Sequence, residues 1–127
     1  MAANTSPIFA LSPELSFATV TGATMTNTVT LLTAATNGTK ITQIGAKVAG
    51  TNTATLVLIF VSDSSGANFK LFDEIALAAV TAGNTTTSQR AVTAYSDLQL
   101  KAGQVVKVGT TVAVSDGVNV FAVKGDY

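Results

Sequence analysis

The chain has 127 residues, a length that fits one domain able to bury its own core. Seven basic and seven acidic residues give a net charge of zero, and only 11% of residues are charged, against roughly 25% in typical soluble domains. Cysteine, histidine and tryptophan are absent, which excludes disulfides, thiolate catalysis and metal sites built on Cys or His. The polar surface must therefore consist mainly of hydroxyl and amide groups, a composition that suits a permanent assembly.

The first residues, "MAANTSPIFALSPEL", lack the basic stretch and uninterrupted apolar stretch of a secretory signal, so we expect synthesis and retention in a cytosol. Two Ser-Pro steps, Ser6-Pro7 and Ser12-Pro13, are expected to forbid a regular strand ladder in this segment. Ser12, Pro13 and Glu14 can together cap one helical turn. The sequence thus predicts an extended N-terminal arm over residues 1–15 and a β-sandwich domain over residues 16–127.

This arm carries three large apolar side chains, Ile8, Phe9 and Leu11. They would face water unless the arm packs on its own domain or on a neighbouring molecule, and both arrangements agree with the sequence. In the second case, deleting the arm would leave a folded domain that no longer binds its neighbour.

The following residues alternate between apolar and polar with period two, and turn signals recur about every 8 to 12 residues, as in an all-β sandwich or barrel. Residues 28–33 form the first predicted strand. Asn37-Gly38 follows, the dipeptide that most readily takes the positive φ angles of a tight hairpin turn. The next predicted strand covers residues 41–49.

The stretch "ATLVLIFVS", residues 54–62, breaks the alternation because Leu56–Val61 are all apolar. It is too short to cross a membrane, which takes about 18 or more apolar residues. A strand of this kind must be covered on both faces, inside a sandwich or by a neighbouring subunit. It also lacks a charge or proline to prevent edge pairing, so we expect it in a central or covered position.

After this run the chain turns at "DSSG", residues 63–66, and residues 68–77 are expected to return as its antiparallel hairpin partner. Residues 73–83, "DEIALAAVTAG", are compatible with a strand or with a short helix begun by Asp73 and Glu74, and the strand is preferred. The remaining predicted elements are a long loop or rim strand at 82–89, strands at 90–95 and 98–114, a turn at Asp116-Gly117 and a last strand at 118–127.

About eight short strands in one domain leave three candidate folds: a jelly roll, an immunoglobulin-like sandwich and a small barrel. The immunoglobulin-like fold loses its usual Cys and Trp markers. We therefore predict a single-domain, antiparallel, jelly-roll-like β-sandwich. Alternation alone does not determine the strand order.

Few residues are suited to catalysis or metal binding, because the commonest general base and the thiol nucleophile are missing. Asp73 and Glu74 are adjacent, so in a strand they point to opposite faces and cannot flank one glycosidic bond. Asp63 and Asp116 resemble parts of calcium loops but are better interpreted as turn formers. We expect no enzymatic activity, no catalytic or metal-binding residues and no cofactor.

Binding of nucleic acid or sugar finds limited support in the sequence. The lysines are isolated along the strands rather than clustered, which argues against nucleic acid. Sugar rings often stack on Trp or Tyr, and only Tyr95 and Tyr127 are present. A glycan-binding role would therefore depend on polar loops such as residues 82–89.

Two segments, "ANTSPIFALSPE" near the start and "NVFAVKGDY" at the end, resemble small β-sandwich proteins encoded among the structural genes of tailed bacteriophages. The resemblance implies a virion component without catalysis, either a decoration or cement protein of the capsid, often trimeric, or a head-fibre or tail subunit.

The expected function is therefore a virion structural protein that decorates or cements a phage capsid. It would be made in the host cytoplasm and reside on the capsid surface, with itself as a homotrimer and the major capsid protein as partners, and without nucleic acid, membrane or small-molecule substrate. The alternative is a receptor- or glycan-binding module of a head fibre or tail, which would present polar loops at one end rather than a flat face. The candidate interface residues are Pro7, Ile8, Phe9, Leu11, Phe121 and Tyr127.

Overall fold

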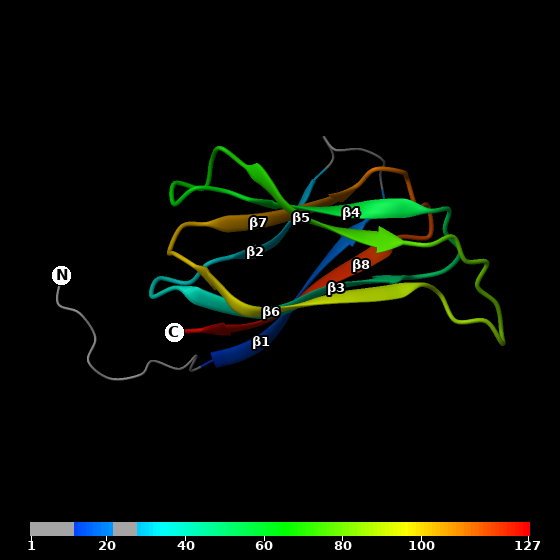
Figure 1. Ribbon diagram of the computed structural model, residues 1–127, viewed down its shortest axis with the longest axis horizontal. Helices are drawn as coiled ribbons and strands as arrows, with labels where there is room; N and C mark the ends of the chain where they lie inside the picture. Colours follow the sequence, from blue (N-terminus) through cyan, green and yellow to red (C-terminus); the bar gives the residue numbers. More distant parts are fainter. Residues whose placement is uncertain (1–11, 22–27) are drawn as a thin grey trace.

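The computed structural model describes residues 12–21 and 28–127, and the elements in this part are all β-strands (Figure 1). Among these residues no helix is long and apolar enough to cross a membrane. The strands are β1 (Ser12–Val20), β2 (Val29–Thr33), β3 (Thr39–Val48), β4 (Thr55–Val61), β5 (Lys70–Leu77), β6 (Arg90–Leu100), β7 (Val105–Thr110) and β8 (Val118–Asp126).

The strands form two stacked antiparallel sheets of four, in the orders β1-β8-β3-β6 (the first sheet) and β2-β7-β4-β5 (the second sheet) (Figure 1). Most consecutive strands lie in opposite sheets, and β4 and β5 are the one consecutive pair joined in the same sheet. This arrangement is a jelly-roll sandwich. The predicted fold class is confirmed, while the part of the arm formed by residues 1–11 lies outside the described residues.

The start of the domain differs from the prediction. Ser12, Pro13 and Glu14 do not form a helical turn but begin β1, which pairs with β8 from Ser12 opposite Asp126 onward. Because β1 is an edge strand, only one of its sides needs ladder hydrogen bonds, and a proline is tolerated there. Residues 12–15 therefore belong to the sandwich.

The core lies between the sheets and follows the alternation of the sequence. In β8, for example, Val118, Val120 and Ala122 are fully buried, whereas the residues between them face outward. Each fully buried aliphatic side chain contributes about 1.5–3 kcal/mol relative to exposure to water. The largest fully buried side chains include Ile41, Ile44, Ile59, Leu77, Val57, Val108 and Val120.

The apolar run occupies the position expected of it, since β4 lies between β7 and β5. Val57 and Ile59 point into the core and are fully buried. Leu58, which points outward, is nevertheless only 3% exposed, while Leu56 and Phe60 are half-buried. The lack of alternation thus reflects cover on both faces, and at Leu58 the cover comes from this chain.

The connections include one incorrect and one correct turn prediction. Gly38 does take a positive φ of 95°, but Asn37-Gly38 joins strands of opposite sheets and is not a hairpin turn. In contrast, residues 63–66 do lie in the loop between the paired strands β4 and β5. In both cases the residue types correctly predict a turn, but they do not reveal whether the flanking strands pair with each other.

Two other boundaries were also wrong. The predicted strand at 90–95 and the first residues of the predicted strand at 98–114 form one strand, β6, which continues through a bulge opposite β3. The predicted strand at 98–114 is instead divided by a turn in which the Gln104 amide donates to the Lys101 carbonyl and Gly103 has a φ of 89°. Of residues 73–83, for which a strand was preferred over a helix, 73–77 belong to β5, whereas 78–83 lie in the connection to β6.

Candidate interaction surface

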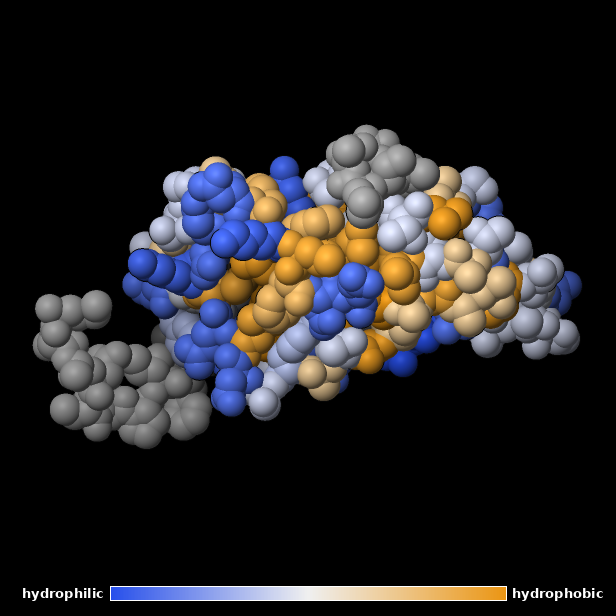
Figure 2. All heavy atoms as spheres, turned by 45° about the horizontal axis from the view of Figure 1, so that its top comes forward, coloured by the Kyte–Doolittle hydropathy of each residue, from blue (hydrophilic) through white to orange (hydrophobic). Residues whose placement is uncertain are grey.

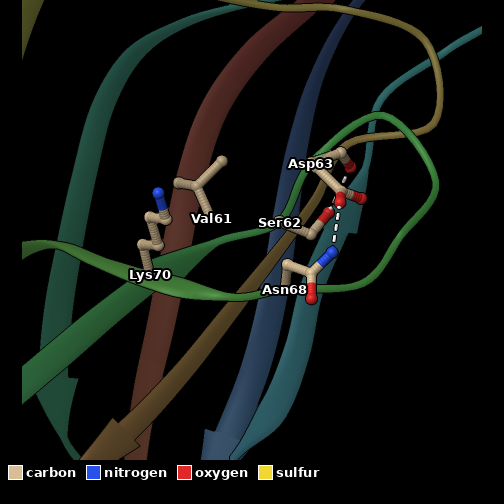
Figure 3. A pocket seen from close by; sticks show the side chains of 5 residues that line it. All are labelled: Val61, Ser62, Asp63, Asn68 and Lys70. Atoms are coloured by element: carbon tan, nitrogen blue, oxygen red, sulfur yellow. Dashed lines mark hydrogen bonds between the residues drawn. The ribbon is translucent and has the colours of Figure 1, made fainter.

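The loop between β4 and β5 contains the carboxylate of Asp63, which is bound by residues of its own turn; Figure 3 shows its contact with Asn68. Asp63 Oδ1 accepts hydrogen bonds from the amides of Ser65 (2.9 Å) and Ala67 (3.2 Å), and Oδ2 accepts one from the Asn68 side chain (2.7 Å). Bonds from the Ser65 hydroxyl, Asn68 and Ala67 lower the pKa of Asp63 far below its usual range. The pocket beside this loop is lined by Val61, Ser62, Asp63, Asn68 and Lys70.

A second charged cluster joins three strands of the first sheet. The ammonium of Lys124 lies 3.1 Å from Glu14 Oε2 and 3.3 Å from Asp126 Oδ1, and its side chain is 7% exposed. The Thr39 hydroxyl donates to Asp126 over 2.8 Å, and this bond, with Lys124 beside it, lowers the pKa of Asp126. Burial opposes the charge of Lys124, but its bonds to Glu14 and Asp126 raise the pKa of Lys124 overall.

The adjacent carboxylates Asp73 and Glu74 do not converge. The Tyr95 hydroxyl donates to Asp73 Oδ2 over 2.6 Å, and burial together with this bond raises the pKa of Tyr95. Glu74 is exposed and lies opposite Leu58 on the outer side of the second sheet. No group of three or more acidic side chains in the described part of the chain is placed to hold a metal ion.

The outer face of the first sheet carries apolar side chains on neighbouring strands. In the strand register Phe17 of β1 lies opposite Phe121 of β8, Phe121 lies opposite Gly45 of β3, and Gly45 lies opposite Val92 of β6. Phe17 is 62% exposed, and its ring centroid lies 6.3 Å from that of Phe121, with the ring planes tilted by 54°. These side chains form one continuous row across the sheet.

A second apolar pair lies beside this row. Leu15, two residues before Phe17 in β1, lies opposite Val123, two residues after Phe121 in β8, and they are 50% and 37% exposed. We name the resulting set the apolar patch. It consists of Leu15, Phe17, Val92, Phe121 and Val123.

Gly45 determines how the patch is built. A Cβ atom at this position would overlap the Phe121 ring and lie 2.9 Å from Cγ2 of Val92. This glycine has a specific role, because the missing side chain leaves room for Phe121 to lie over β3. The apolar patch therefore depends on a residue without a Cβ atom at position 45.

The other sheet also exposes apolar side chains. Figure 2 brings the second sheet forward and shows apolar residues along the middle of this side of the molecule. Leu71 and Phe72 of β5 are 49% and 45% exposed. The Phe72 ring, however, packs against that of Tyr95, with 5.8 Å between the ring centroids. Glu74 and Lys107 interrupt the outer face of this sheet. The apolar patch of the first sheet is less interrupted by charge.

Of the candidate interface residues, Pro7, Ile8, Phe9 and Leu11 lie outside the described residues. Phe121 belongs to the apolar patch. Tyr127 lies apart from it at the chain end, where its amide donates to the Gly38 carbonyl over 3.1 Å.

The sequence analysis missed Leu15, Phe17, Val92 and Val123. A signal for two of them was present in "SPELSFATV", where Leu15 and Phe17 alternate with Ala18 and Val20 so that both faces of the strand carry apolar residues. The predicted arm over residues 1–15 includes Leu15, so this alternation was not recognised as part of a strand.

Comparison with known proteins gave no match: no family model, curated protein or solved structure is significantly similar to this chain. Inferences about function therefore depend on the chemistry of the surface and on the sequence itself.

The contact between Gly45 and Phe121 can be tested by mutation. Gly45→Ala should lower the free energy of unfolding by about 1–3 kcal/mol, because the added methyl group overlaps the ring. In a chain that also carries Phe121→Ala, the same substitution should cost clearly less. Urea unfolding of the four proteins measures this difference, and equal costs in both backgrounds would contradict the proposed overlap. Gly83→Ala is the control, since a Cβ there meets no atom within 4 Å.

The Asp63 loop predicts a pH dependence of stability. Because the pKa of Asp63 is lowered in the folded state, the folded protein binds fewer protons than the unfolded chain in acid. The stabilisation should thus be complete above about pH 5 and decrease as the pH falls below the unfolded value of about 4. Asp63→Asn should lower the urea midpoint at pH 7 and flatten its decline between pH 5 and pH 3. Asp97→Asn, at an exposed site of β6, is the control at pH 7; an unchanged pH profile in Asp63→Asn would refute the prediction.

Proposed function

We propose that this chain is a non-enzymatic structural protein of a phage virion that decorates or cements the capsid through protein–protein contacts. The observation that carries the proposal is the apolar patch. Phe17 and Leu15 are half or more exposed on a sheet face, next to Phe121 and Val123 on the adjacent strand. Contiguous exposed aromatic and aliphatic side chains mark interaction sites in otherwise soluble proteins.

The virion part of the proposal is supported by the two segments that resemble phage structural proteins. The first segment ends in β1 and the second forms nearly all of β8, and these strands pair directly. Residues of the second segment, Phe121 and Val123, contribute to the apolar patch. The described end of the first segment, Ser12–Glu14, and nearly all of the second thus lie on neighbouring strands, and the second segment supplies two residues of the candidate surface.

The composition supports permanent assembly. With no net charge and 11% charged residues, the chain has little electrostatic repulsion to keep copies apart. This agrees with a subunit that remains bound to other proteins. We extend the proposal to a homotrimer that contacts the major capsid protein.

A receptor- or glycan-binding module is the second candidate, and one observation favours it. Three polar loops, residues 49–54, 78–89 and 111–117, meet at one end of the sandwich (Figure 1). The Thr51 amide donates to Asp116 (2.9 Å), the Thr51 hydroxyl accepts from the Ala82 amide (3.1 Å), and Asn52 bridges to Val80. A recognition module would present loops joined in this way.

Quantitative mass spectrometry of purified particles from the source tests the proposal. We expect a number of copies per major capsid protein near one or a simple fraction of one. A handful of copies per particle would favour a tail or fibre module instead. Absence of the chain from particles would refute a virion role altogether.

Deletion of residues 1–11 tests the contribution of the arm. The described sandwich begins at Ser12, so the truncated chain should unfold at the same urea concentration as the full chain. We expect it to be depleted from particles at least about tenfold. Wild-type copy numbers in the truncated virus would show that the arm is not needed for attachment.

A further inference from the structure

The outer face of the first sheet carries positive charge at both ends of the apolar patch. At one end Lys40 of β3 lies opposite Gly125 of β8 and Gln99 of β6. At the other end Lys47 of β3 lies opposite Arg90 of β6. The rows of the apolar patch lie between these two ends, so apolar side chains are flanked by three cations.

These three cations are not neutralised within the described part of the chain. The ion pairs there involve Lys124, which sits on the other side of β8 and is occupied by Glu14 and Asp126. Lys47 donates to the Ser88 carbonyl, a neutral acceptor, over 2.9 Å, and Arg90 is exposed. Every residue paired across this face is neutral or basic. Asp97, exposed in β6 beside the inward-packed Leu98, is the one carboxylate of these four strands without an ion pair. The three cations outnumber it, so the face is positive although the chain has no net charge.

The charge decides which occupant fits. A second copy stacked on this face would bring its Lys40, Lys47 and Arg90 against the same residues of the first copy, with Asp97 as the single unpaired carboxylate of the sheet to offset them. Juxtaposed like charges disfavour such a contact. An anionic lipid surface is a weaker match, because recognition of that kind usually takes clusters of four to eight basic residues, and the face has three.

We infer that this face docks an acidic protein surface, in which an apolar recess receives Phe17 and Phe121 and carboxylates face Lys40, Lys47 and Arg90. The inference rests on the proposed function and specifies the partner's chemistry: it is the shell protein of the particle, and its contact site combines apolar and acidic side chains. Aromatic anchors supply most of the binding energy in such contacts, and flanking charges set orientation and association rate.

The experiment uses particles that lack this chain, to which purified protein is added back. Bound copies per particle are counted after sedimentation at several protein concentrations. Phe17→Ser and Arg90→Glu each change an exposed side chain, so both variants should keep the wild-type urea midpoint. Their matched controls are Leu71→Ser, at a similarly exposed apolar site of the second sheet, and Lys101→Glu, at an exposed cation of the β6–β7 turn.

We expect each face variant to weaken binding at least about tenfold and each control to stay within about twofold of wild type. Raising the salt from about 0.05 M to about 0.5 M should weaken wild-type binding more than that of Arg90→Glu. Salt screens the attraction between Arg90 and the partner's carboxylates, and the variant lacks this attraction.

The outcomes separate the inference from the proposed function. If wild type binds but both face variants bind equally well, the chain remains a virion protein and the docking face is wrong. If native particles lack the chain and wild type does not bind, the proposed function fails and the inference fails with it. Two further measurements complete the test: self-association by sedimentation velocity, and binding to phosphatidylserine vesicles. Self-association or vesicle binding that Phe17→Ser abolishes would assign the face to a second copy or to lipid, and either result would overturn the inference.

Discussion

The register of β8 between β1 and β3 determines both the core and the candidate surface. Along β8, Val120 and Ala122 point inward and are fully buried, so Phe121 and Val123 must point outward. A slip of one residue would exchange the two sets and expose the core. Burial of the inward-facing residues of β8 in the core therefore also fixes the row in which Phe17 and Phe121 lie opposite each other.

The distribution of charge follows from how the carboxylates are used. Several of them complete the fold: Asp63 closes its own loop, Asp73 binds Tyr95, Asp116 binds the Thr51 amide, and Glu14 and Asp126 surround Lys124. The cations of the first sheet's outer face receive no such partner in the described part of the chain. A chain with zero net charge thus presents one positive face, because most of its carboxylates are engaged elsewhere in the fold.

The sequence predicted the sandwich well because alternation is a local property. It also predicted the covered position of β4, since a strand without alternation cannot leave one face in water. It did not predict which strands pair. Asn37-Gly38 has the same turn chemistry whether or not its flanking strands are neighbours. The patch was missed for a similar reason: Phe17 and Phe121 are far apart in the sequence, and only their register makes them one surface.

The edges of both sheets are poorly suited to strand addition, which leaves the faces as the places for association. In the first sheet β1 carries Pro13, and β6 is paired to β3 through a bulge. In the second sheet both edge strands, β2 and β5, are irregular against their partners, with register shifts near Leu32 and Phe60. Prolines and bulges at edges discourage pairing with another chain. A protein that protects its edges in this way and still exposes Phe17 on a flat face is arranged to bind through side chains rather than through its backbone.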